Sequence, residues 1–213
     1  MIDLPRRHLL LLAPVLLAGC AALDFATRTP PRLFMLTPKS TFATDLPDLG
    51  RLPLLIETPT AASGLNSARI VLKPTPTSFE YYAGATWTEV LPVMVHGLVV
   101  ESFDNTGSVD AFDRMNVAGR ADWALSLHIR ELQPEYADVR QPPTINVRLQ
   151  ARLLRLPRRE EVGFASFETE WPASGTDLVA IVGAMDEAFG RVVKNLVEWT
   201  IHSIADAGPG PSR

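Results

Sequence analysis

The chain has 213 residues, 46% of them hydrophobic, and this length and composition indicate one globular domain with a sizeable core. Its formal net charge of −4 is mild and mixed in sign, which argues against a nucleic-acid partner, because such proteins usually carry a clustered basic face. The single cysteine excludes intrachain disulfides and thiolate metal clusters, so the hydrophobic core must stabilise the fold.

The segment around this cysteine has the architecture of a bacterial lipoprotein signal. Arg6 and Arg7 precede an apolar run, and the sequence Leu17-Ala18-Gly19-Cys20 ends that run with small residues before the cysteine. The run is roughly ten residues long and contains Pro14, whereas a transmembrane helix needs about 20 apolar residues. We therefore expect cleavage between Gly19 and Cys20, and acylation of Cys20 with palmitate-type chains that anchor the protein to a membrane.

This signal predicts both the division of the chain and its location. Residues 1–19 form the signal peptide, 20–32 a lipidated tether, 33–206 one domain and 207–213 a disordered tail. We expect the domain in the bacterial cell envelope, lipid-anchored and facing the periplasm. Ala21 stands where an aspartate would favour retention in the inner membrane, so the outer membrane is expected rather than the inner one.

The first half of the domain is predicted to contain short strands and one helix. Strands are expected at 33–36, 52–57, 69–73 and 79–82, with a loop at 61–67. The helix is expected over 87–103, capped by Thr88 and with Pro92 tolerated near its start. It is apolar nearly all round, which predicts burial on more than one side.

The second half is predicted to form three long strands and a long helix. Apolar and polar residues alternate over 123–130 and 145–153, which is typical of an antiparallel sheet with one buried face, and 162–171 is expected as the third strand after a turn at 157–160. The helix is expected over 177–205, capped by Thr176. The predicted fold class is therefore α+β: a single domain with a mostly antiparallel sheet and two long helices packed on one face.

The sequence contains no recognisable catalytic or metal-binding pattern. None of the four histidines, His8, His96, His128 and His202, lies at metal-ligand spacing from another histidine or a carboxylate. There is no Gly-x-Ser-x-Gly elbow, no P-loop and no Gly-x-Gly-x-x-Gly turn. We expect a protein that is not an enzyme and holds no cofactor or metal, with His96 as a helix residue whose ring nitrogen has a partner.

Charged side chains gather on the polar face of the three long strands. Arg130, Arg148 and Arg152 point the same way, and Glu168 and Glu170 are placed to face them. A basic strip could meet an anionic partner or lipid headgroups. Ion pairs across neighbouring strands are the favoured interpretation of the same pattern.

Four aromatic residues in one segment form the candidate surface for a partner. They are Phe79, Tyr81, Tyr82 and Trp87. Core packing around the first helix explains the same residues equally well, because aromatic side chains dominate both cores and interfaces.

Several short motifs follow the tether in a fixed order. They are Leu33-Phe34-Met35-Leu36, Leu54-Leu55-Ile56, the loop at 61–67, Arg69-Ile70-Val71-Leu72, and Phe79-Glu80-Tyr81-Tyr82 followed by Trp87 and Pro92. In this order the chain resembles the ABC-type transport auxiliary lipoprotein family, which includes paraquat-inducible C-like lipoproteins. The resemblance spans 33–204, and its most specific part is 64–92.

The resemblance implies a non-catalytic part of an envelope lipid transport system. In such systems a permease and an ATPase work with a periplasmic protein that bears mammalian-cell-entry domains, and the auxiliary lipoprotein contacts that protein. Self-association into a ring is compatible with this role. Two other interpretations stay open: a carrier lipoprotein that holds an acyl chain between sheet and helices, and an envelope lipoprotein with a structural role only.

Overall fold

The core of the fold is a long central strand that is paired along both of its edges. The computed structural model describes residues 30–112 and 121–208, and the predictions for the signal peptide, the Gly19–Cys20 cleavage site and Cys20 acylation lie outside these residues. The described strands and helices, in chain order, are β1 (Arg32–Phe34), β2 (Leu52–Ile56), β3 (Thr60–Ala61), the 3₁₀ turn η1 (Ser63–Leu65), β4 (Arg69–Thr75), β5 (Ser78–Trp87), α2 (Leu91–Asp104), β6 (Val109–Phe112), β7 (Trp123–Glu135), β8 (Thr144–Arg155), β9 (Glu160–Pro172) and α3 (Leu178–Ala207).

The three long strands form the antiparallel sheet that the alternating pattern predicts. β7 pairs with β8 and β8 pairs with β9, with Leu125 opposite Leu153 and Leu149 opposite Phe167. The register of β7 against β8 shifts between Ile129 and Glu131, so a bulge there adds one residue to β7. The predicted α+β fold with a mostly antiparallel sheet is confirmed.

Short strands pair in parallel with the other edge of β7; the sequence predicts strands at the positions of β2 and β4 but not this pairing. β2, β3 and β4 pair with β7 in succession, and β6 extends the sheet beyond β2. β4 then pairs antiparallel with β5, which carries β1 at its far side. β4 continues through Pro74 to Thr75, because the register shift after Leu72 accommodates a residue without a backbone donor.

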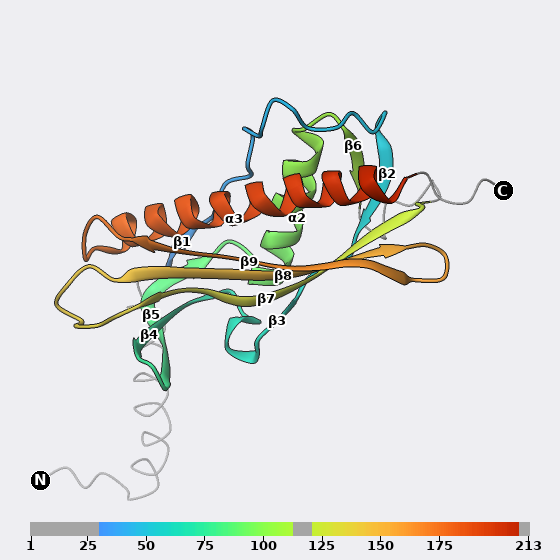
Figure 1. Ribbon diagram of the computed structural model, residues 1–213. Helices are drawn as coiled ribbons and strands as arrows, with labels where there is room; N and C mark the ends of the chain where they lie inside the picture. The colour runs from blue at the N-terminus through green and yellow to red at the C-terminus, as the bar shows by residue number, and fades with distance from the viewer. Residues whose placement is uncertain (1–29, 113–120, 209–213) are drawn as a thin grey trace, which may run out of the picture. The chain divides into compact units, whose positions relative to one another are not determined.

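Both helices lie on the same face of the sheet, as predicted (Figure 1). The start of the first helix was predicted wrongly: Trp87 ends β5, and α2 begins only at Leu91. Thr88 does not cap α2, because its backbone N–H donates to the carbonyl of Phe34 and the N-cap is Val90, whose side chain makes no capping bond. Pro92 lies in the first turn of α2, where a proline is tolerated.

The cap of the second helix was also predicted one residue early. Asp177, not Thr176, is the N-cap of α3, and its carboxylate accepts hydrogen bonds from the backbone N–H groups of Val179 and Ala180. A carboxylate at this position is additionally favoured by the helix dipole. α3 then runs for 30 residues over β9, β8 and β7.

The interior between the sheet and the helices is filled by large side chains. Trp87, Trp123, Phe103 and Phe189 are all nearly inaccessible to solvent. The chain from 36 to 49, here called the crossing segment, passes over the helices on the side away from the sheet and adds Leu36 to this core. α2 is therefore buried on two sides, which explains why its sequence is apolar nearly all round.

Candidate functional site

The four aromatic residues predicted as a partner contact lie along β5, and the fold places them in different environments. Trp87 is only 2% exposed and packs in the core, so it offers no surface to a partner. Tyr81 is partly buried, with the guanidinium of Arg69 3.6 Å from its ring centroid. Phe79, near the turn between β4 and β5, is 55% exposed. Of the four, Phe79 is the side chain best placed to meet another molecule.

Tyr82 belongs to a hydrogen-bonded pair that links β5 to the end of β7. Its hydroxyl lies 2.6 Å from the hydroxyl of Tyr136. Burial raises the pKa of Tyr82 above its ordinary value, and the hydrogen bond to Tyr136 raises it further. Tyr82 therefore stays neutral at physiological pH, and its hydrogen bond to Tyr136 links β5 to the end of β7 at this corner of the sheet.

The polar face of the sheet is an ion-paired surface, which confirms the favoured interpretation of its charges, but two of the partners differ from the prediction. Arg148 pairs with Glu131 on β7 at 2.8 Å, and Arg152 pairs with Glu161 on β9. Glu168 lies opposite Arg148 in the β8–β9 register. Arg148 nevertheless pairs with Glu131 on β7, the strand on the other side of β8. The bulge in β7 explains this choice, because it turns Glu131 onto the face that carries Arg148.

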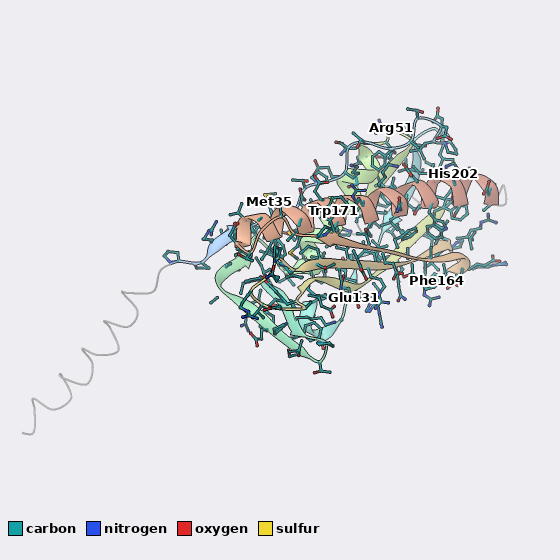
Figure 2. All side chains as sticks on the ribbon, turned by 60° about the vertical axis from the view of Figure 1, so that its left-hand side comes forward. Met35, Arg51, Glu131, Phe164, Trp171 and His202 are labelled. Carbon is teal, nitrogen blue, oxygen red and sulfur yellow. The ribbon has the colours of Figure 1, made fainter. Side chains whose placement is uncertain are left out.

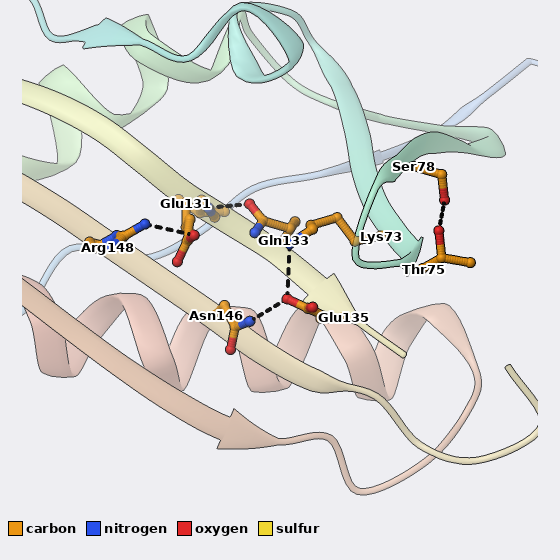
Figure 3. A network of polar contacts seen from close by, with 9 residues as sticks. Lys73, Thr75, Ser78, Glu131, Gln133, Glu135, Asn146 and Arg148 are labelled. Carbon is orange, nitrogen blue, oxygen red and sulfur yellow. Dashed lines mark hydrogen bonds and ion pairs between the residues drawn. The ribbon is translucent and has the colours of Figure 1, made fainter. Parts of the chain in front are cut away.

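A second polar contact joins three strands at the far end of the same face (Figure 3). The ammonium of Lys73 on β4 and the amide of Asn146 on β8 both donate to one oxygen of Glu135 on β7, at 3.1 and 2.8 Å. Gln133, two residues earlier on β7, is 1% exposed and accepts a hydrogen bond from the backbone N–H of Leu132. The two contacts to Glu135 hold β4, β7 and β8 together, while the buried Oδ1 of Asn146 has no hydrogen-bond partner within the described residues.

Two of the histidines, His96 and His128, make local hydrogen-bonding contacts. The Nε2 of His96 lies 3.1 Å from the carbonyl oxygen of Ile56, which confirms the expectation that its ring nitrogen has a partner. His128 lies on the polar face, 2.7 Å from the hydroxyl of Thr60. Desolvation and the nearby charge of Arg130 lower the pKa of His128, so its neutral form dominates at neutral pH.

Within 30–112 and 121–208, no group of three or more His, Cys, Asp or Glu side chains is arranged to hold a metal ion. The helices of these two ranges are also too short or too polar to cross a bilayer.

The crossing segment, which sequence reasoning missed, forms a shallow hollow with α3. The hollow encloses about 360 Å³, and the side chains around it are mostly charged or polar, including Lys39, Asp186, Arg191 and Lys194. Arg191 also stacks on Trp171, 4.0 Å from the ring centroid. The apolar residues Leu36, Phe42, Leu46 and Leu49 are the only sequence signal for this segment, and their spacing fits neither a strand nor a long helix.

Known proteins resemble this chain over most of its length. A family model described as the ABC-type transport auxiliary lipoprotein component matches residues 34–197. An uncharacterised protein of Bradyrhizobium diazoefficiens is 26% identical over 151 residues, which cover 71% of this chain and 40% of that relative. The chain thus spans less than half the length of this relative.

Two solved structures share the fold. The crystal structure of protein XCC0632 from Xanthomonas campestris superposes with a TM-score of 0.75 at 26% identity, covering 82% of this chain and 97% of that one. A second, uncharacterised protein superposes with a TM-score of 0.62 at 9% identity, covering 79% of this chain and 97% of that one. The family match extends from the last residue of β1 to Val197 in α3 and thus takes in β2 to β9, the whole of α2 and most of α3. The chain therefore belongs to the family of ABC-type transport auxiliary lipoprotein components.

Proposed function

We propose that this protein is a lipid-anchored auxiliary component of an ABC-type envelope lipid transport system and that it docks, without catalysis, onto a periplasmic protein with mammalian-cell-entry domains. The observation that carries the proposal is the family match over 34–197. Acylated Cys20 supplies the anchor, and Ala21 favours the outer membrane as its location.

The architecture suits a docking role. A filled core, ion pairs across the polar face of the sheet and a crossing segment bonded to both helices suit a rigid body with a fixed surface. A membrane tether confines such a body to a thin layer beside its partner, so the effective concentration is high and modest contacts suffice. Phe79 is the exposed aromatic residue of the β4–β5 hairpin and the first candidate for the contact.

The carrier interpretation has less support. An acyl chain between sheet and helices needs an open apolar cavity, whereas Ile56, Val95, Val99 and Leu149 fill that space with no solvent exposure. The hollow beside α3 is lined by charged groups and does not suit a hydrocarbon chain. Lipid extracted from the purified protein would nevertheless favour the carrier.

A crosslinking capture from native membranes tests the docking role. The full-length protein should recover a mammalian-cell-entry-domain protein, and the Cys20→Ser variant should recover much less of it, because the domain is no longer held at the membrane. Phe79→Ser tests the contact itself, with Val139→Ser, an equally exposed loop residue, as the matched control. Failure of the full-length protein to recover any transport component would contradict the proposal.

Membrane fractionation and native mass measurement complete the test. The acylated protein should sediment with the outer-membrane fraction, and its intact mass should correspond to a chain that starts at Cys20 with its acyl chains. Assembly into a ring is compatible with docking onto a tubular partner, and the native mass distinguishes a ring from a monomer.

A further inference from the structure

Exposed apolar side chains mark the end of the domain at which the described chain begins. Leu33 and Met35 are 66% and 62% exposed, because they point outward from a segment whose alternate residues, Phe34 and Leu36, point inward. Val179, in the first turn of α3, is 57% exposed. Scattered exposed apolar residues are ordinary, whereas a group of them indicates a contact surface.

The crossing segment establishes how Leu33 and Met35 lie relative to α3. Thr37 donates hydrogen bonds to Asp186, and Ala43 donates one to Glu198. The two donors are six residues apart in the crossing segment, and the two acceptors are twelve residues apart on α3. The two chains therefore run side by side in the same direction. Two extended residues span about 6.6 Å and four helical residues about 6 Å, so each pair of residues in the segment accompanies about one turn of α3.

The same spacing applies to the residues before Thr37: Met35 lies about one helical turn, and Leu33 about two turns, closer to the start of α3. Both residues therefore lie beside the first turns of α3. Figure 2 agrees, because Met35 lies at the N-terminal end of that helix. Val179 is exposed at the same end. Leu33, Met35 and Val179 therefore form one exposed surface, here called the apolar end patch.

The length of the chain before the patch identifies the surface that it meets. Only eleven residues, 21–31, separate Cys20 from the start of β1 at Arg32, and fully extended they span at most about 40 Å. An anchor at Cys20 would thus keep the patch within about 40 Å of the bilayer, at the end of the domain that is tethered to it. The charges beside the patch, Arg32, Glu89 and Asp177, are of mixed sign, so attraction to anionic headgroups is not the driving force.

We propose that the apolar end patch inserts into the interface of the bilayer that holds the acylated Cys20, and so fixes the orientation of the domain. This inference rests on the lipid anchor of the proposed function. α3, about 45 Å long, would then point away from the membrane. Arg155 donates to the carbonyl of Ala207, so the β8–β9 hairpin lies at the distal end of α3, and Figure 2 shows Phe164 and His202 at that end.

Site-specific fluorescence on the full-length lipoprotein in phosphatidylethanolamine–phosphatidylglycerol vesicles tests the insertion. An acylated Cys20 carries no free thiol, so Met35→Cys provides a unique position for an environment-sensitive label, and Val162→Cys on β9 provides a matched, exposed apolar control at the distal end. We expect about twofold or greater quenching by nitroxide-bearing lipids at 35 relative to 162, because interfacial insertion reaches about 5–10 Å into the bilayer. High salt should leave this difference unchanged.

A second variant separates insertion from mere proximity. Leu33→Ser in the Met35→Cys background should lower the quenching, while the far-ultraviolet circular dichroism stays unchanged because Leu33 lies outside the core. Equal quenching at 35 and 162 with acylated Cys20 would overturn the inference and leave the proposed function intact. A label at 35 that is shielded from water but not quenched by lipid would also overturn it, since a protein then covers the patch. A free, unacylated Cys20, detected by intact mass, would contradict the anchor and the inference together.

Discussion

Thr37 donates both its backbone N–H and its hydroxyl to the carboxylate of Asp186, at 2.6 and 2.8 Å, across 149 residues of sequence. Lys39, two residues later, donates its N–H to the hydroxyl of Ser102 on α2. Within the crossing segment, Thr37 thus binds α3 and Lys39 binds α2. It joins the two helices on the side that the sheet does not reach.

Replacing Asp186 by alanine should loosen the crossing segment. The change removes both acceptors of Thr37, and the free energy of unfolding should fall by about 1 kcal/mol, since the contact is charge-assisted but exposed. Relative to the wild-type protein, amide hydrogen exchange should become faster at Thr37 and Lys39 and should stay unchanged in the strands. Urea unfolding and exchange mass spectrometry measure the two effects.

Glu187→Ala is the matched control for that change. Glu187 is the next carboxylate on α3 and is exposed, so its removal should change the free energy of unfolding by less than about 0.5 kcal/mol. Equal effects of the two substitutions would mean that net charge, not the Thr37 contact, determines the result.

Arg148 should depend on Glu131 and not on Glu168. Glu131→Gln removes the 2.8 Å ion pair of a partly buried arginine and should cost about 0.5–1 kcal/mol of unfolding free energy. Glu168→Gln, which alters the residue opposite Arg148 in the β8–β9 register, should cost less. Thermal unfolding of both variants at low salt compares them, and a larger loss for Glu168→Gln would contradict the observed pairing.

The sequence predicted the parts of the fold that depend on local periodicity. β7 and β8 follow a two-residue pattern, since one face is buried and the other is mostly polar, and α3 follows a helical stripe. The parallel pairing of β2, β3 and β4 with β7 was not predictable, because it depends on contacts between residues far apart in the chain. The bulge in β7 is marked in the sequence only by the adjacent charges Arg130 and Glu131, after which the apolar positions change from odd to even numbers.

The candidate site was less predictable than the fold. An aromatic cluster has the same composition whether it packs in a core or faces a partner, and Trp87 lies in the core whereas Phe79 lies on the surface. Leu33 and Met35 belong to the motifs on which the family resemblance rests, but their exposure follows from the path of the crossing segment over α3. Only tertiary structure supplies that path.

The cap of α3 offers a direct comparison of neighbouring residues. Asp177→Ala removes the acceptor for the N–H groups of Val179 and Ala180 and should cost about 1 kcal/mol of unfolding free energy. Thr176→Ala should be close to neutral, because Thr176 precedes the cap and is exposed. Urea unfolding of the two variants measures the difference, and a greater loss for Thr176→Ala would place the start of the helix one residue earlier.

Tyr82 should make the stability of the fold fall at alkaline pH. Its pKa is raised in the folded state, so the folded protein holds the phenolic proton more tightly than the unfolded chain, whose tyrosine titrates near pH 10. The stabilisation is therefore fully present below about pH 10 and is lost as the pH rises beyond it. Urea unfolding from pH 8 to 11 should show the wild-type protein losing stability relative to Tyr82→Phe across this range.

Tyr136→Phe removes the hydrogen bond but leaves Tyr82 buried. Since burial is the larger cause of the raised pKa of Tyr82, this variant should retain most of the pH dependence. A flat profile for Tyr136→Phe would assign the raised pKa to the hydrogen bond instead.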